Sequence, residues 1–263
     1  MKAMIFAAGL GTRLKPITDT MPKALVPVCG QPLLYHVISK LVAAGYDDLV
    51  VNVHHFPDQI IHYLHSHDFG ARISVSDERD FLRETGGGIK YARPLLVKEE
   101  IPGQAGNDGQ AGNDGREPFL VHNVDIVSNL DLGWLREQHR EDALATIVVS
   151  ERKTQRYFLF DEDNRLKGWT NIATGEVRSS SPDIDLDRCR KLAFAGIHLM
   201  SPAIFEAFDQ YGFGDRFSIV DFYLRACADY PIYAAVPPDF QLVDVGKFDA
   251  LPEAEATCRR WLP

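Results

Sequence analysis

A short loop of small residues near the start of the chain is followed by three cations. The loop, Ala-Ala-Gly-Leu-Gly-Thr at 7–12, comes after the apolar run 2–6, and Arg13, Lys15 and Lys23 come after it. Glycine lets a backbone approach a ligand closely, and backbone N–H groups beside fixed cations bind polyphosphates. In a chain with a net charge of −9, this local cationic cluster indicates a cradle for a polyphosphate.

Two aspartates are placed where a divalent metal ion could bind. Asp125 follows the short apolar run 119–121, and Asp244 lies in the run 242–246, where a predicted strand ends in a glycine. Magnesium usually binds one or two carboxylates together with substrate phosphates. Either acid alone could equally belong to a helix cap or a turn, but nucleotidyl transfer needs charge neutralisation, and the pair suits it.

The first loop and a second segment together resemble the signature of sugar-1-phosphate nucleotidyltransferases. The first part is Ala7-Ala8-Gly9-x-Gly11-Thr12-Arg13-Leu14-x-Pro16, and the second is Pro22-Lys23-Ala24-Leu25-Val26-Pro27-Val28. The resemblance implies an NTP and a sugar 1-phosphate as substrates, with Mg²⁺ as cofactor. It also implies that Arg13 binds the triphosphate and that Lys23 binds the reacting phosphates.

Further segments resemble other elements of the family. Glu84-Thr85-Gly86-Gly87-Gly88 resembles its second glycine loop, 123–125 its Gly-Asp element, and 193–197 its sugar-side strand. Asp77 or Glu78 stands where the family has a base-reading side chain, and a carboxylate there could accept from uracil or from guanine. The resemblance thus implies catalytic Arg13, Lys23 and Asp125; nucleotide-binding Ala7, Ala8, Gly9, Gly11, Thr12, Arg13, Glu78, Gly86 and Gly87; sugar-binding Glu84, Thr85, Asn123 and Gly196; and metal-binding Asp125 and Asp244.

One departure from the family concerns the sugar phosphate. Many relatives carry a Glu-Lys-Pro element between the two acids, whereas the comparable stretch here, 166–171, reads Leu-Lys-Gly-Trp-Thr-Asn, so that Lys167 is the candidate substitute. The compact chain and the second glycine loop are most similar to the N-acetylmuramate 1-phosphate uridylyltransferase branch. UTP with N-acetylmuramate or a related hexosamine 1-phosphate is therefore the expected substrate pair. Mannose and heptose 1-phosphate guanylyltransferases form the neighbouring branch.

Two other functions remain open at the level of sequence. A phosphocholine-type cytidylyltransferase would need an aromatic cage for its quaternary ammonium, to which Tyr157, Trp169 and Phe194 could contribute. A catalytically silent nucleotide-sugar sensor would be favoured by loss of the cationic loop or the acids. All of these groups are present, which counts against a sensor.

The elements that position these groups follow from apolar periodicity. Apolar runs at 2–6, 49–53, 72–76 and 119–121 predict strands, and the segments 31–44, 58–67 and 89–96 predict helices between them. Alternating strands and helices predict an α/β fold: a Rossmann-like, open, mostly parallel sheet with helices on both faces, as in nucleotide-diphospho-sugar transferases of the GT-A type. Ligands of such sheets bind at the carboxyl ends of the strands, where the first loop lies.

The whole chain, 1–263, is predicted to form one domain. A nucleotide half to about residue 130 precedes a sugar half at about 131–240, and a helix at about 247–261 closes the fold. The repeat of QAGNDG at 104–115 predicts a surface loop.

The composition of the chain limits its possible binding partners and surroundings. The acidic net charge argues against nucleic acid, and no apolar run reaches the length of a membrane span. Four separated cysteines without a Cys-x-x-Cys pair predict buried thiols, which favours a cytoplasmic enzyme. A monomer or homodimer is expected.

Overall fold

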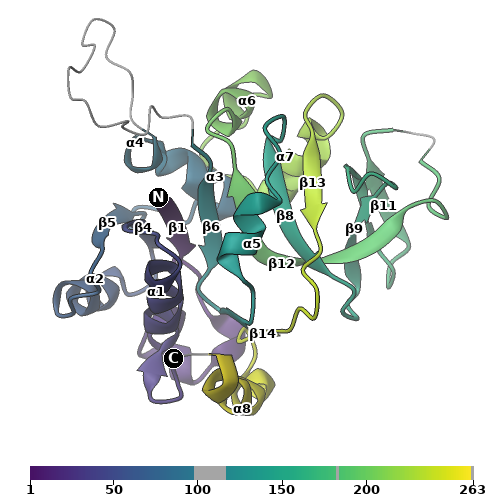
Figure 1. The fold of residues 1–263 in the computed structure, drawn as a ribbon. Helices are drawn as coiled ribbons and strands as arrows, with labels where there is room; N and C mark the ends of the chain where they lie inside the picture. Colours follow the sequence, from purple (N-terminus) through teal and green to yellow (C-terminus); the bar gives the residue numbers. More distant parts are fainter. Residues whose placement is uncertain (98–116, 182–183, 262–263) are drawn as a thin grey trace, which may run out of the picture.

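The computed structural model describes residues 1–97, 117–181 and 184–261, and the repeat at 104–115 lies outside them. Its centre is a ten-stranded sheet (Figure 1). One side of this sheet is parallel, in the order β6-β1-β4-β5. These strands are β1 (Lys2–Phe6), β4 (Asp48–Val53), β5 (Arg72–Asp77) and β6 (Phe119–Asn123). The carboxyl ends of β1 and β6 therefore meet at one edge, as predicted.

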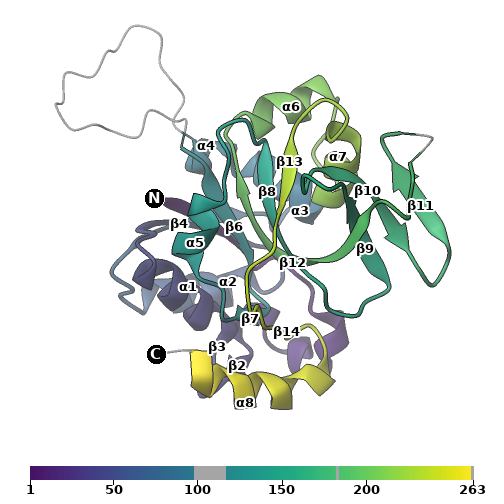
Figure 2. The same cartoon turned by 45° about the vertical axis from the view of Figure 1, so that its right-hand side comes forward.

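The other side of the sheet is mixed. The long strand β12 (Arg190–Met200) runs antiparallel to β6, β8 (Ala145–Ser150) and β9 (Arg156–Phe160). Strand β13 (Ile232–Ala235) joins β8 in parallel. Strands β10 (Leu166–Asn171) and β11 (Glu176–Ser179) continue from β9 as an antiparallel ribbon that projects from the body, on the right of Figure 2.

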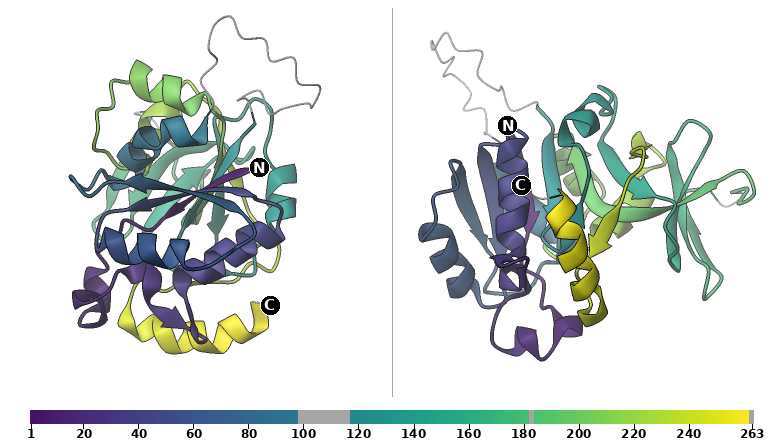
Figure 3. Two further views of the ribbon diagram at one scale, coloured as in Figure 1. Left: turned by 90° about the vertical axis from the view of Figure 1, so that its left-hand side faces the viewer. Right: turned by 60° about the horizontal axis from the view of Figure 1, so that its bottom comes forward.

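Helices cover both faces of the sheet, which confirms the predicted fold class (Figure 3). One apolar core joins the sheet to α1 (Leu33–Ala43), α2 (Pro57–His65), α5 (Leu132–Glu137) and α8 (Leu251–Trp261). The second core joins it to α3 (Glu84–Tyr91), α4 (Arg93–Leu96), α6 (Ile204–Gln210) and α7 (Ile219–Ala226). Among the described residues, no helix combines the length and apolar character that crossing a membrane requires.

Two small sheets and four short 3₁₀ helices complete the described fold. β2 (Pro27–Val28) pairs with β3 (Gln31–Pro32), and β7 (Ile126–Ser128) pairs with β14 (Leu242–Asp244). Three of the 3₁₀ helices, at Thr12–Leu14, Ile17–Asp19 and Lys23–Leu25, shape the first loop, and the fourth, at Phe248–Ala250, leads into α8. The β7–β14 pair draws the end of the chain beside Asp125.

Two local expectations were wrong. The three glycines at 86–88 lie inside α3 and do not form a loop before it. Cys29 is disulfide-bonded, while Cys189 and Cys227 are free thiols, so the expectation of thiols throughout was also wrong.

Two buried histidines make the stability of the fold depend on pH. Burial lowers the pKa of His122 from 6.5 to about 4 and that of His198 to about 3. The folded state therefore favours neutral imidazole, and its full stability is present above the unfolded pKa of 6.5. Stability is lost as the pH falls from there towards the folded pKa values.

We expect His198→Leu to weaken this dependence. Between about pH 6.5 and about pH 4.5, each histidine should contribute a loss of about 1.4 kcal/mol per pH unit to the wild-type free energy of unfolding. The variant also leaves the Tyr223 hydroxyl, 2.7 Å from His198 Nδ1, without that partner, so the slope and not the absolute stability is the readout. Urea unfolding across this pH range measures it, and an unchanged slope would contradict the assignment.

Candidate active site

A cavity of about 400 Å³ opens at the carboxyl edge of the parallel strands. It brings together residues from the first loop, the start of α3 and the end of β6. The predicted site residues that line it are Ala7, Ala8, Gly9, Lys23, Glu84, Thr85, Asn123 and Asp125. Nucleotide-side, sugar-side and charged candidates thus share one cavity.

The first loop is shaped by two glycines with different surroundings. Gly11 has a φ of +64°, and a Cβ there would lie 2.8 Å from Thr18 Cγ2, so this glycine is required by the packing of the loop on itself. Gly9 lines the cavity, and a Cβ on it would meet nothing within 4 Å among the described residues. Gly9 therefore leaves space for a ligand. Thr12 and Arg13 are exposed and do not line the cavity.

Lys23 and Asp125 form an ion pair across the cavity floor, between Nζ and Oδ2. The side chains are 11% and 18% exposed, respectively. A largely desolvated pair of this kind fixes both groups, because removing either partner leaves a poorly solvated charge. The structure thus brings together the lysine and the acid that the motifs singled out.

Asp244 joins this pair through the β7–β14 ladder. It lies opposite Ile126, the residue after Asp125, and the Val245 N–H donates to the Asp125 carbonyl at 2.8 Å. Asp244 Oδ1 is buried and has no hydrogen-bond partner among the described residues. Magnesium binds carboxylate oxygens from one or two acids together with substrate phosphates. The unpaired oxygen of Asp244, on a strand that pairs beside Asp125, therefore fits the predicted metal site.

Arg13 approaches the same acid. A Cβ on Gly246 would lie 2.6 Å from Asp244 Oδ1 and 2.7 Å from Arg13 Nη2. Only glycine at 246 lets the arginine of the first loop and the late aspartate come this close. The structure therefore places Arg13 beside the predicted metal site, although it does not line the cavity.

The glycines at 86 and 87 are placed by packing and not by a ligand. Their N–H groups both donate to the Phe217 carbonyl, at 2.9 and 3.2 Å. A Cβ on Gly86 would collide with the Phe217 ring, and one on Gly87 would collide with the Asp215 carbonyl. The expectation that Gly86 and Gly87 offer free N–H groups to the nucleotide was therefore wrong.

The neighbouring residues Glu84 and Thr85 do reach the cavity. Glu84 has a φ of +62° and its Oε1 accepts from Arg216 Nε at 3.0 Å, while Thr85 Oγ1 accepts from the Ile219 N–H at 2.9 Å. The segment before α7 thus holds the start of α3 in place. Its residue Ser218 lines the cavity too.

Glu78 lies behind the cavity and is 0% exposed. Its carboxylate accepts hydrogen bonds from Asn52 and from the Arg83 backbone. Burial raises its pKa, and these hydrogen bonds act in the opposite direction. The structure therefore does not bring Glu78 to a position where it could contact a base directly, contrary to expectation.

On the sugar side, Gly196 supports Asn123. Gly196 has a φ of +73° and sits at the irregularity between β12 and β8, where a Cβ would lie 2.7 Å from Asn123 Nδ2. Lys167, the candidate for the missing family lysine, has its Nζ 3.8 Å from Asp161 Oδ2 and does not line the cavity.

Sequence reasoning missed Asn52 and Ser218 as cavity residues. Asn52 is the polar residue in the apolar run of β4, and a buried amide in such a strand is a signal that could have marked it. Ser218 is the N-cap of α7, and its side chain accepts from the Val220 N–H. A capping serine carries no sign in the sequence that it also lines a cavity.

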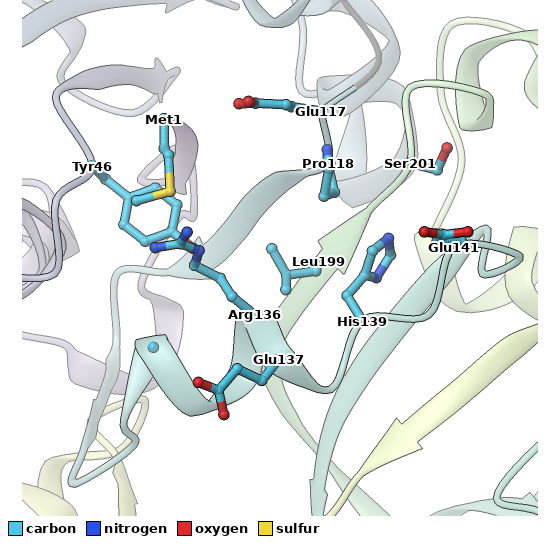
Figure 4. Close-up of a pocket in the computed structure, with 11 residues that line it drawn as sticks. Met1, Tyr46, Glu117, Pro118, Arg136, Glu137, His139, Glu141, Leu199 and Ser201 are labelled. Atoms are coloured by element: carbon cyan, nitrogen blue, oxygen red, sulfur yellow. The ribbon is translucent and has the colours of Figure 1, made fainter. Parts of the chain in front are cut away.

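A larger cavity of about 1140 Å³ lies at the opposite edge of the sheet (Figure 4). Met1, Pro118 and Ser201 line it, and they mark the amino ends of β1 and β6 and the carboxyl end of the antiparallel β12. None of the predicted site residues lines it. The predicted site residues that line either of these two cavities therefore all line the smaller one.

A sequence profile of one family, described as nucleotidyl transferase, matches residues 2–172. A relative matches almost end to end: N-acetylmuramate alpha-1-phosphate uridylyltransferase of Caulobacter vibrioides is 33% identical over 262 residues, 97% of this chain and 95% of that protein. The chain belongs to the nucleotidyl transferase family. The predicted membership of the sugar-1-phosphate nucleotidyltransferases is thereby confirmed, and the protein is an enzyme of that class.

Other proteins resemble this nucleotidyltransferase over part of the sequence or in the fold alone. Mannose-1-phosphate guanyltransferase of Yarrowia lipolytica is 33% identical over 154 residues, 57% of this chain and 38% of that protein. The crystal structure of HddC from Yersinia pseudotuberculosis has a TM-score of 0.72 at 21% identity, covering 97% of this chain and 98% of that one. A UDP-glucose pyrophosphorylase complexed with UDP-glucose has a TM-score of 0.72 at 17% identity, covering 98% of each chain. These two structures share the fold.

We expect Gly9→Ala to affect nucleotide binding and Gly87→Ala to affect stability, because Gly9 faces the cavity and Gly87 packs against protein. Gly9→Ala should keep the wild-type melting temperature and weaken nucleotide binding about tenfold or more, because the methyl group enters the cavity. Gly87→Ala should lower the stability by about 1–3 kcal/mol, because its Cβ collides with backbone. Thermal melting and calorimetric titration with nucleotide measure the two effects, and equal melting temperatures for both variants would contradict this reading.

Proposed function

We propose that this nucleotidyltransferase transfers UMP from UTP to N-acetylmuramate 1-phosphate, or to a related hexosamine 1-phosphate, and releases pyrophosphate. The observation that carries the proposal is the end-to-end match, at 33% identity, to a protein named for that reaction. The match includes both the cationic loop and the late segment that carries Asp244. The first loop, Lys23 and Asp125 share one cavity, and the β7–β14 ladder brings Asp244 opposite the residue after Asp125, which supports the same reaction type.

In the proposed reaction, a sugar-1-phosphate oxygen attacks the α-phosphorus of the nucleotide, and the bond to pyrophosphate breaks. No general base is needed, since the attacking phosphate is already an anion near neutral pH. Lys23 would hold the two phosphates against their mutual repulsion, and Arg13 would neutralise charge on the leaving pyrophosphate. Ala7, Ala8 and Gly9 line the space for the nucleotide, and Asn123, Glu84 and Thr85 line the space for the sugar.

Asp125 and Asp244 would hold the Mg²⁺ ion. When bound, magnesium would neutralise phosphate charge. Asp125 also binds Lys23, so this carboxylate orders the lysine whether or not a metal is present. Asp244 Oδ1 is left available by the protein itself, as far as the described residues show.

The second candidate is guanylyl transfer from GTP to mannose 1-phosphate or heptose 1-phosphate. The observation that favours it is the match, at 33% identity over 154 residues, to mannose-1-phosphate guanyltransferase. The cavity is lined by backbone and small side chains there, which suit either base.

We expect pyrophosphate release in Mg²⁺ only when UTP is combined with N-acetylmuramate 1-phosphate or a related hexosamine 1-phosphate. The measurement is a grid of four NTPs against a panel of sugar 1-phosphates, with phosphocholine included. Release confined to GTP with mannose or heptose 1-phosphate would establish the second candidate. CTP with phosphocholine would indicate the cytidylyltransferase alternative, and silence from folded, nucleotide-binding protein would indicate a sensor.

We expect Lys23→Ala to lower kcat by about 10²–10³-fold, because a preorganised charge at the reacting phosphates is lost. Arg72→Ala is the control: this arginine is 69% exposed and pairs with Asp48 at the amino end of β5, away from the cavity. Its removal should change kcat less than about twofold. Circular dichroism checks that both variants fold. A Lys23→Ala enzyme with most of its turnover would contradict the role given to this lysine.

A further inference from the structure

Asn52, which lines the cavity, and Glu78, which lies behind it, form a buried polar pair. Asn52 is 1% exposed and lies on β4, and Glu78 is 0% exposed and follows β5. A buried carboxylate is costly unless its hydrogen bonds are satisfied. The proposed reaction gives Glu78 no contact with substrate, so its burial at this point calls for another explanation.

The pair connects two backbone segments that line the cavity. Asn52 Oδ1 accepts from the Ala7 N–H at 2.8 Å and from the Ala8 N–H at 3.3 Å. Its Nδ2 donates to Glu78 Oε1 at 2.7 Å, and Glu78 Oε2 accepts from the Arg83 N–H at 3.3 Å. The hydrogen bonds thus run without interruption from the first loop to the segment before α3.

The second segment depends on Glu78 at two points. Arg83 lies between Leu82 and Glu84, which both line the cavity. Inside α3, a Cβ on Gly88 would lie 2.9 Å from Glu78 Oε1, so the helix packs directly on the carboxylate. One carboxylate therefore sets the position of both the β5–α3 connection and α3.

The donors and acceptors leave little freedom in residue type. Two backbone N–H groups fix the Asn52 carbonyl oxygen toward the first loop, so its amide nitrogen must face Glu78. Glu78 then meets two donors, from Asn52 and Arg83, and an ionised carboxylate supplies two acceptors where a glutamine supplies one acceptor and one donor. The backbone N–H groups on the two sides therefore require an amide at position 52 and a carboxylate at position 78.

We propose that Asn52 and Glu78 are positioning residues, which hold the two cavity segments at the separation that a nucleotide requires. The inference rests on the nucleotide site proposed above and adds residues that act through the loops. Asn52 holds the Ala7 and Ala8 N–H groups on the nucleotide side. On the sugar side, Glu84 and Thr85 are also held by Arg216 and Ile219. A change in the pair should therefore alter nucleotide affinity more than the affinity for sugar phosphate.

Exchanging the amide and the carboxylate between positions 52 and 78 tests this inference. Asn52→Asp places a second carboxylate oxygen against Glu78 Oε1, and we expect it to weaken UTP or GTP binding at least about tenfold. Glu78→Gln alone sets a donor against a donor and should weaken binding less. In the double variant Asn52→Asp/Glu78→Gln the new amide donates to the new carboxylate and accepts from the Arg83 N–H. Binding should return to within about threefold of wild type.

Calorimetric titration with UTP and with GTP in Mg²⁺ gives the affinities well below each melting temperature. Tyr223→Phe is the control, because it removes a buried hydrogen bond to His198 away from the two loops; it should lower the melting temperature without changing affinity. If Asn52→Asp does not fold, recovery of folded, nucleotide-binding protein in the double variant supports the proposal equally. Losses in the double variant that equal or exceed the sum of the single losses would overturn it.

Affinity also separates this inference from the proposed function. A wild-type enzyme that binds nucleotide but releases no pyrophosphate would contradict the proposed reaction. The titrations of the single and double variants would still test the positioning role of Asn52 and Glu78. A folded wild-type chain that binds neither UTP nor GTP would overturn both. Equal changes in the KM for nucleotide and for sugar phosphate in Glu78→Gln would show a general structural role and would overturn the positioning role.

Discussion

The proposed site brings many negative charges close together, and their mutual repulsion must be offset by cations. Asp244 pairs with Ile126 in the β7–β14 ladder, and Asp125 directly precedes Ile126. The proposed substrates add several phosphate charges in a chain whose net charge is already −9. The ion pair of Lys23 with Asp125 offsets one of these charges within the protein itself. Arg13, held beside Gly246, places a second cation at the same point. Without these cations, the cavity would repel the polyphosphate that the loop is shaped to receive.

The strand directions explain why these groups can meet. Strands β1, β4 and β6 are parallel, so the residues after them, or near their ends, gather at one edge. Strand β12 runs the other way, and Gly196 lies just before the part of β12 that pairs with β6, against Asn123 at the end of β6. The mixed sheet thus contributes to the site from strand ends and from the middle of an antiparallel strand.

The sequence was sufficient for the parts of the site that local chemistry determines. The strand–loop–lysine order of the first segment and the open position of Gly9 follow from residue types and spacing, whereas the ion pair of Lys23 with Asp125 appears only in the structure. The two acids could be named because each ends an apolar run. The α/β class followed from the alternation of strands and helices, although the irregular ribbon β10–β11 carries too weak a pattern to place.

What could not be predicted depends on partners far along the chain. Gly86 and Gly87 have the composition of a ligand loop, but Phe217 and Asp215 occupy the space beside them. Glu78 has the charge of a ligand contact, but its burial is set by Asn52 on a different strand. Local pattern distinguishes a glycine that faces ligand from one that faces protein only when the facing segment is known.

The β7–β14 ladder has a consequence for how the enzyme is made. It joins residues near 126 to residues near 243, so one of the two proposed metal ligands arrives only after nearly all of the chain has been synthesised. Contacts between such distant segments form late, because the intervening chain must first be ordered. Ribosome-bound or partly folded chains would then possess the nucleotide loop without the second acid. Metal-dependent nucleotide affinity would accordingly report completed folding of the enzyme, while metal-independent affinity would report the first loop alone.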